Sequence, residues 1–156
     1  MANQLDVGDK APAFSMTRDG GGTVSLADLK GKKVVLYFYP KDDTPGCTTE
    51  AIDFTALKAD FARAGAEVIG VSRDSVARHE KFAAKHKLGV ALGGDEDGTV
   101  TEAYGVWQEK SLYGRKYMGI MRATFLIDGE GVIRHIWPKV SVKGHAAEVL
   151  AAAQAL

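Results

Sequence analysis

The chain contains one cysteine, Cys47, and its surroundings in the sequence favour chemistry at the sulfur. The unbroken apolar run 34–38 precedes it and has the length and the β-branched and aromatic content of a buried strand. Phe54, Leu57 and Phe61 follow it at spacings of three and four, which predicts a helix. Because the free N–H groups of a first helical turn favour negative charge, a thiol placed there is expected to be partly ionised. Cys47 is therefore a candidate nucleophile, rather than a small buried apolar side chain.

Two carboxylates close to the cysteine oppose this interpretation. Asp42 and Asp43 lie just before it, and a nearby negative charge disfavours a thiolate. The compensating cation is therefore expected from another part of the chain. Lys41 is the local option, although a solvated loop lysine is its more ordinary role.

Pro40, Thr44 and Cys47 form the spacing Pro-x-x-x-Thr-x-x-Cys, and on this motif the sequence resembles the peroxiredoxins. The fuller string Tyr-Pro-Lys-Asp-x-Thr-Pro-Gly-Cys-Thr-x-Glu, residues 39–50, is similar to the bacterioferritin-comigratory, or Q-type, branch. The resemblance implies that Thr44 orients a peroxide oxygen and that Pro40 shields the thiolate. It also implies that backbone N–H groups around Gly46 and Cys47 stabilise negative charge in the site.

A second stretch extends the resemblance to the middle of the chain. Residues 114–122 resemble the Q-type pattern Gly-x-x-Tyr-x-Gly-Ile-x-Arg, which precedes a strand. The resemblance makes Arg122 the active-site arginine, which stabilises the thiolate and polarises the peroxide. Glu50 matches a family glutamate that is expected to fix Arg122 or the loop, although a simple helix-start carboxylate is the alternative. Trp107 and Tyr113 either line the approach to the site or pack at its rim.

The resemblance implies a thiol peroxidase that acts on hydrogen peroxide and organic hydroperoxides, by way of a sulfenic acid at Cys47. Many Q-type members carry a resolving cysteine five residues further on, where this chain has Ile52. With one cysteine no internal disulfide can form, so an external thiol must resolve the sulfenic acid. Thioredoxin, glutaredoxin, glutathione and a small dithiol all remain open, and overoxidation at high peroxide is expected.

Two other functions fit parts of the sequence. A thioredoxin-type disulfide oxidoreductase requires Cys-x-x-Cys, but residue 50 is a glutamate, and no proline precedes the strand at Thr124. A peroxide sensor that passes its oxidation to a partner through a mixed disulfide needs only the same thiolate, so the sequence leaves this alternative open.

Composition limits the other possibilities. The 156 residues are expected to form one domain, 1–156, and the formal net charge of zero gives no case for nucleic-acid or membrane binding. The N-terminal residues lack the basic and apolar regions of a signal peptide, and the single cysteine suits a reducing cytoplasm. No His/Cys cluster has zinc spacing, so neither a metal nor an organic cofactor is expected. A monomer is favoured by the resemblance.

Alternating strand and helix patterns predict an α/β thioredoxin-like fold, with a central mixed sheet flanked by helices and an N-terminal β-hairpin extension. His79 and His86 are predicted on the surface of one helix, and residues 106–122 as an irregular, partly exposed segment. The predicted hairpins are 14–24 and 123–137, the predicted strands between them are 67–72 and 90–92, and the predicted helices are 25–31, 47–64, 75–86 and one from about 143 onward.

Overall fold

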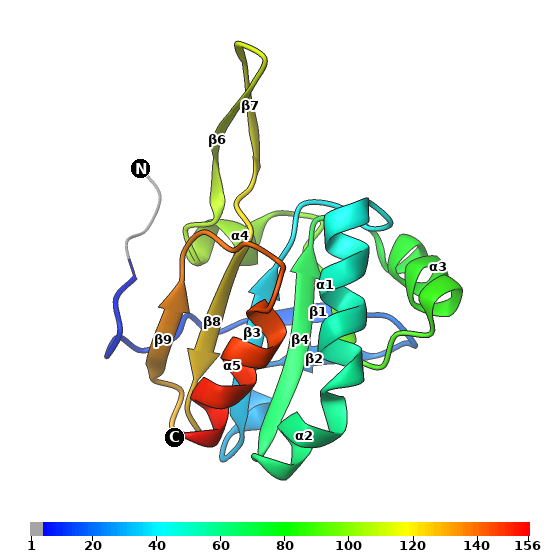
Figure 1. Ribbon diagram of the computed structural model, residues 1–156. Coiled ribbons are helices and arrows are strands. Elements are labelled where there is room, and N and C mark those ends of the chain that lie inside the picture. The colour runs from blue at the N-terminus through cyan, green and yellow to red at the C-terminus, as the bar shows by residue number, and fades with distance from the viewer. Residues whose placement is uncertain (1–4) are drawn as a thin grey trace.

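The computed structural model describes residues 5–156, so the first four residues of the N-terminal lead-in lie outside it. A seven-stranded mixed sheet forms the centre, in the order β2-β1-β5-β4-β3-β8-β9 (Figure 1). Its strands are β1 Ser15–Arg18, β2 Thr23–Ser25, β3 Lys33–Phe38, β4 Ala66–Ser72, β5 Ala91–Gly94, β8 Ala123–Ile127 and β9 Ile133–Trp137. The helices are α1 Pro45–Ala56, α2 Lys58–Arg63, α3 Val76–His86, α4 Thr99–Ala103 and α5 His145–Gln154.

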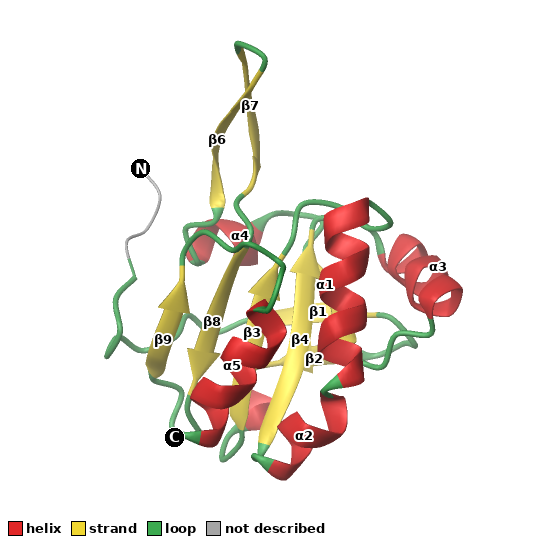
Figure 2. Cartoon of the chain, in the orientation of Figure 1, coloured by secondary structure: helices red, strands yellow, loops and turns green. Residues whose placement is uncertain are grey.

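The middle of the sheet is parallel and buried on both faces. β3 pairs in parallel with β4, and β4 with β5, while β8 and β1 join antiparallel on either side. Alternate residues of β3 enter two apolar clusters, one on each face of the sheet. The helices α1, α2 and α5 cover one of these faces (Figure 2). A strand covered on both faces is expected to be apolar throughout, which is why residues 34–38 show no alternation. The loop after β3 leaves at the carboxyl edge of these parallel strands.

The N-terminal hairpin is confirmed. β1 and β2 pair antiparallel from Ser15 with Ser25 to Thr17 with Thr23, and Gly20, Gly21 and Gly22 all have positive φ in the turn. Only glycine adopts such a run of φ values without strain. The short helix predicted after this hairpin is a single 3-10 turn, Ala27–Leu29.

The long helix predicted from Cys47 to Ala64 is wrong in its continuity. α1 starts earlier, at Pro45, and ends at Ala56, and α2 follows after Leu57, whose φ of −99° and ψ of 6° interrupt the helix. The break lets Phe54 and Phe61 both become fully buried, whereas Leu57 is only partly buried.

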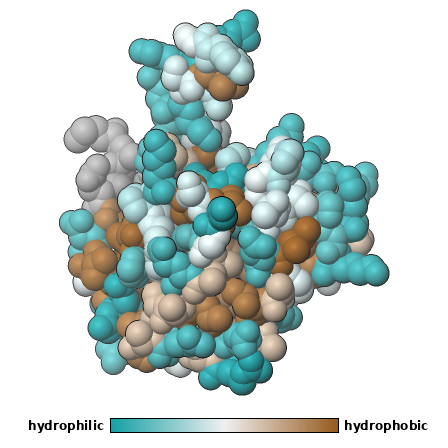
Figure 3. Space-filling model, in the orientation of Figure 1, coloured by the Kyte–Doolittle hydropathy of each residue, from teal (hydrophilic) through white to brown (hydrophobic). Residues whose placement is uncertain are grey.

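The prediction of an irregular segment at 106–122 is also wrong. The strands β6 Trp107–Leu112 and β7 Arg115–Ile120 form a regular antiparallel ribbon that projects from the body of the molecule (Figure 1). Tyr113 and Gly114 turn it with φ of 51° and 78°, the geometry of a two-residue hairpin turn. The segment is mostly exposed, as expected, and Figure 3 shows it as largely hydrophilic with a small hydrophobic patch.

The remaining elements match the predictions. β8 and β9 form a hairpin, Ser75 caps α3 by accepting from the N–H of Arg78, and α5 buries Ala146, Val149 and Ala153. Within residues 5–156, none of the helices is long and apolar enough to cross a membrane.

Candidate active site

Cys47 lies in the first turn of α1, directly after the loop that leaves β3. The chain exits the sheet at Tyr39, whose N–H donates to the carbonyl of Val71, and α1 begins with Pro45 at its first helical position. Proline is suited to that position because its N–H would be unpaired there anyway. The side chain of Cys47 is only 1% exposed and belongs to the apolar cluster under α1. The sulfur is therefore at the positive end of a helix and largely shielded from water.

The guanidinium of Arg122 contacts the sulfur. Its Nη2 donates to Cys47 Sγ over 3.4 Å, and its Nη1 donates to Glu50 Oε1 over 2.7 Å. Arg122 stands between β7 and β8, and its carbonyl accepts from the N–H of Val140. Burial by itself lowers the pKa of Arg122, but the charges of Cys47 and Glu50 raise it overall. Arg122 is therefore the cation that was expected to compensate the negative charges near Cys47, and it lies 75 residues away in the sequence.

Glu50 lies one turn after Cys47 on the same helix and is 1% exposed. Burial raises the pKa of Glu50 to about 7, although the charge and hydrogen bond of Arg122 oppose this; Asp53 raises it further. Its second oxygen, Oε2, is buried without a hydrogen-bond partner. The expected contact between Glu50 and Arg122 is present, so this residue is more than a helix-start carboxylate.

The other motif residues lie in the loop before Cys47 and in the first turn of α1. Thr44 is the N-cap of α1, and its Oγ1 donates to the carbonyl of Lys41 over 2.8 Å. Gly46 faces Arg122, and Pro40 is half-buried in the loop. Lys41 itself is exposed, in agreement with its role as a solvated loop lysine.

Sequence reasoning missed a second cation near the site. Lys110, on β6, donates from Nζ to the carbonyl of Ile120 over 2.9 Å. Burial lowers its pKa, the charge of Arg122 lowers it further, and Cys47 raises it. No spacing signal marks Lys110, because the strand that carries it was not predicted. The two aromatic residues of the same stretch lie apart from this cation: Trp107 packs against the guanidinium of Arg73, and Tyr113 is exposed at the hairpin tip.

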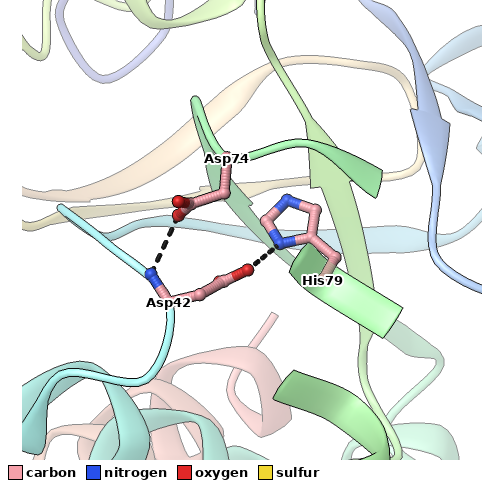
Figure 4. A group of neighbouring side chains, drawn as sticks. All are labelled: Asp42, Asp74 and His79. Atoms are coloured by element: carbon pink, nitrogen blue, oxygen red, sulfur yellow. Dashed lines mark hydrogen bonds and ion pairs between the residues drawn. The ribbon is translucent and has the colours of Figure 1, made fainter. Parts of the chain in front are cut away.

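The prediction that His79 is a surface residue is wrong. His79 is fully buried, and its Nδ1 lies 2.6 Å from Asp42 Oδ2 while its Nε2 lies 2.9 Å from the carbonyl of Gly93 (Figure 4). Asp42 also accepts from the hydroxyl of Tyr39 over 2.6 Å and donates its N–H to Asp74. The Asp42 hydrogen bond and charge raise the pKa of His79 above its usual value, although burial opposes this shift most strongly.

Asp42 and Asp43 were expected to disfavour a thiolate at Cys47, but in the structure both carboxylates have cationic partners. The charge of Asp42 is compensated by His79, and Asp43 is paired with Lys85 over 2.8 Å and His86 over 3.0 Å. The hydrogen bonds to Lys85 and His86 lower the pKa of Asp43. Neither carboxylate is therefore left as an uncompensated charge beside the cysteine.

Asp42, Asp74 and His79 also have the composition of a metal site, with one ligand atom from each within 4.8 Å of the others. Both ring nitrogens of His79 are already engaged, however, and Asp74 Oδ2 accepts from Ser72 and from the Asp42 N–H. The polar atoms of these residues are hydrogen-bonded to one another and to their neighbours. We therefore interpret the cluster as a hydrogen-bond network that anchors the loop before Cys47.

Comparison with known proteins agrees with this geometry. The model of the AhpC/TSA family matches residues 7–136. The putative peroxiredoxin bcp of Coxiella burnetii is 55% identical over 146 residues, covering 94% of this chain and 97% of the relative. Peroxiredoxin Bcp of Bacillus subtilis is 51% identical over 146 residues, with coverages of 94% and 93%.

Solved structures show the same architecture. A crystal structure of Xylella fastidiosa PrxQ superposes with a TM-score of 0.93 at 38% identity and covers 98% of both chains. A structure of the Xanthomonas campestris bacterioferritin comigratory protein superposes with a TM-score of 0.87 at 46% identity, covering 91% of this chain and 90% of the other. The predicted thioredoxin-like α/β fold is thereby confirmed. The chain belongs to the AhpC/TSA family and, within it, to the Bcp or Q-type peroxiredoxins, a family of thiol-dependent peroxidases, of which it is a one-cysteine member.

Proposed function

We propose that Cys47 is the peroxidatic residue and that it reduces hydrogen peroxide and organic hydroperoxides. One observation supports this proposal most directly. Cys47 lies in the first turn of α1, and its Sγ is 3.4 Å from Nη2 of Arg122. The thiolate attacks one peroxide oxygen, the O–O bond breaks, and the second oxygen leaves as an alkoxide or hydroxide that takes up a proton. Sulfur is oxidised to a sulfenic acid and the peroxide is reduced to an alcohol or water.

The surrounding residues stabilise the charge that moves during this step. Arg122 faces both the thiolate and the oxygen that leaves, so it stabilises negative charge before and after the transfer. Thr44 exchanges its hydrogen bond to the Lys41 carbonyl for one to the bound peroxide. Backbone N–H groups at Gly46 and Cys47 point out of the first turn, while Pro40 and the apolar cluster exclude water.

Organic hydroperoxides are included because the Xanthomonas campestris relative is described for its alkyl peroxide reduction activity. A peroxide group is small enough to reach a sulfur that is 1% exposed, whereas a bulky hydroperoxide leaves most of its substituent outside. Small alkyl substituents are therefore the preferred organic substrates.

The oxidised enzyme depends on an external thiol, because the sequence contains no second cysteine. Thioredoxin, glutaredoxin and glutathione are the reductants to compare. We propose a monomer that works in the cytoplasm as one domain, 1–156, without a metal or an organic cofactor. The use of a single cysteine supports the reducing compartment.

The test is the rate at which hydrogen peroxide and a bulkier hydroperoxide are consumed by the reduced protein in a single turnover. The same protein unfolded in urea supplies the matched control, since it presents Cys47 as an ordinary cysteine, and Cys47→Ser supplies the blank. A folded rate several orders of magnitude above the unfolded rate supports the proposal. Equal rates in the folded and unfolded protein contradict it.

A second experiment distinguishes a peroxidase from a peroxide sensor or relay protein. Oxidised protein is mixed in turn with thioredoxin, glutaredoxin and glutathione, and the return of the free thiol is followed. Rapid recovery with one of them identifies the reductant of a peroxidase. Slow recovery with all three, together with a trapped mixed disulfide to another protein, favours the sensor or relay alternative.

A further inference from the structure

Two acidic side chains share one guanidinium in this site. Arg122 donates from Nη2 to Cys47 Sγ and from Nη1 to Glu50 Oε1. Cys47 and Glu50 are each 1% exposed and lie one turn apart on α1. If both were ionised, the site would hold two buried negative charges against a single direct cationic partner.

In the described chain, no cation other than Arg122 donates a hydrogen bond to either acid of this pair. Asp53, further along α1, adds negative charge toward Glu50, and Tyr37 from β3 is a neutral phenol whose pKa is raised first by burial and then by Glu50 and Cys47. Lys110 from β6 acts on Arg122 and Cys47, but its ammonium donates to the Ile120 carbonyl. His145 from α5 is held neutral, since burial and the charge of Arg122 lower its pKa.

The hydrogen bonding of Glu50 agrees with a carboxyl group that carries a proton. Oε1 accepts from Arg122, whereas Oε2 is buried and accepts from no group of the described chain. A buried carboxylate normally has several donors, because losing water without replacement is costly. A proton on Oε2 lowers that cost, because a neutral hydroxyl is less costly to bury than an ionised carboxylate, and it leaves the bond from Arg122 to Oε1 unchanged.

We propose that Cys47 and Glu50 hold one proton between them in the reduced enzyme, and that Glu50 gives up this proton when Cys47 is oxidised. The inference deepens the proposed function and rests on it. Once sulfur becomes an uncharged sulfenic acid, Glu50 is the one anionic partner that Arg122 keeps among residues 5–156, which favours the ionised carboxylate. Burial raises the pKa of Glu50 to about 7, so a change in its surroundings can alter its protonation near neutral pH.

The reaction balances without a proton from the solvent. The peroxide oxygen that the sulfur attacks carries one proton, and this proton stays on it in the sulfenic acid. The O–O bond breaks, its electron pair leaves with the second oxygen, and that oxygen receives the proton that Cys47 and Glu50 shared. The products are the sulfenic acid, the Glu50 carboxylate and the alcohol or water. Reduction of the sulfenic acid by the external thiol returns one proton to the pair.

The proton that Glu50 releases can be measured from the proton uptake of the protein during a single oxidation. Reduced protein in weak buffer is mixed with hydrogen peroxide and a pH indicator, and the protons taken up are compared with the fraction of thiolate measured separately by ultraviolet absorbance. If sulfur alone titrates, uptake equals the thiolate fraction at every pH. If Glu50 releases its proton, uptake falls short of the thiolate fraction by the proton that Glu50 loses.

The expected result for the wild type is a shortfall that is absent at alkaline pH, appears as pH falls through about 7, and grows toward one proton at lower pH. Glu50→Gln keeps the shape of the side chain and an acceptor for Arg122, and it is expected to abolish the shortfall. Asp53→Asn, on the same helix, removes a charge that raises the pKa of Glu50, so it is expected to keep the shortfall but to move it to lower pH. Ionisation of the sulfenic acid would persist in Glu50→Gln, where the neighbouring negative charge is gone, so it does not account for a shortfall that this variant loses.

Each outcome decides the inference. A wild-type shortfall that survives in Asp53→Asn and is lost in Glu50→Gln supports it, and so does loss of a protonated-carboxyl infrared band when the wild type is oxidised. Uptake that equals the thiolate fraction in the wild type at every pH overturns it while leaving the peroxidase proposal intact. A wild-type protein that does not react with peroxide faster than an ordinary cysteine overturns both.

Discussion

Gly46 packs so closely against Arg122 that a β-carbon at this position would lie 3.2 Å from Nη2. The first turn of α1 and the guanidinium therefore fit closely, and a side chain at 46 would require the guanidinium to move by a few tenths of an ångström. Arg122 is fixed in this way from three directions: by the backbone of α1, by Glu50, and by the Val140 N–H at its own carbonyl.

This contact predicts that Gly46→Ala lowers the second-order rate with hydrogen peroxide by about tenfold, because small displacements of a catalytic group have large effects on rate. Alanine is favoured over glycine within a helix, so the free energy of unfolding is expected to stay equal or to rise by up to about 1 kcal/mol. Single-turnover kinetics and urea denaturation measure the two quantities. A variant that keeps the full rate would show that Arg122 does not need its observed position.

Replacing the arginine itself is expected to have a larger effect. Arg122→Gln removes the charge shared by Cys47 and Glu50, and we expect the rate with peroxide to fall by about 10²–10³-fold, the usual cost of losing one preorganised donor at a reacting oxygen. The thiolate fraction at neutral pH, followed by ultraviolet absorbance, is expected to fall with it. Arg115→Gln, exposed on the hairpin, is the matched control and is expected to leave both quantities unchanged.

The buried pair of His79 and Asp42 predicts a pH-dependent stability. The pKa of His79 is raised in the folded protein, so its contribution is fully present below 6.5 and is lost as pH rises through the folded pKa. His79→Gln is expected to lower the free energy of unfolding by about 3 kcal/mol near pH 6, because it leaves the Asp42 charge buried without its partner.

Urea denaturation at several pH values checks this prediction. The loss caused by His79→Gln should shrink as pH rises above 6.5, whereas His135→Gln, an exposed position, should show little change at any pH. A loss of stability that is constant with pH would mean that His79 is neutral in the folded protein.

The lack of a second cysteine predicts overoxidation. Because no internal thiol traps the sulfenic acid, excess peroxide without a reductant is expected to convert Cys47 to the sulfinic acid. Intact-protein mass spectrometry should show a species with two added oxygen atoms, absent from Cys47→Ser. Addition of an effective thiol reductant before the peroxide should suppress it. A spectrum that never passes one added oxygen would contradict the prediction.

The sequence predicted the parts of the fold that depend on local patterns. β3, the loop at Cys47 and the β8–β9 hairpin follow from apolar runs and turn residues. Arg122 could be placed beside Cys47 only through the family resemblance, because nothing local relates two residues 75 positions apart. Residues 107–120 were missed as strands because lysines, glycine and exposed polar side chains obscure the alternation of an unburied ribbon.

The error at His79 has a specific cause. The helix of residues 76–86 was recognised, but a histidine was assumed to prefer water. His79 lies three residues before Phe82, which places the two side chains on the same face of α3, and Phe82 is an aromatic residue that an amphipathic helix buries. The spacing therefore contained the signal for burial, whereas the partner that makes burial favourable, Asp42, lies 37 residues away.

The burial of the Cys47 sulfur also determines which reagents this enzyme ignores. A thiolate open to solvent exchanges with the disulfides it meets. At 1% exposure, Cys47 is more accessible to a molecule of two oxygen atoms than to a disulfide or an alkylating agent, and, like them, the external thiol that reduces the sulfenic acid needs the sulfur to become more exposed. Under the proposed function, burial therefore limits which reagents react with the one thiol of the chain and favours small peroxides.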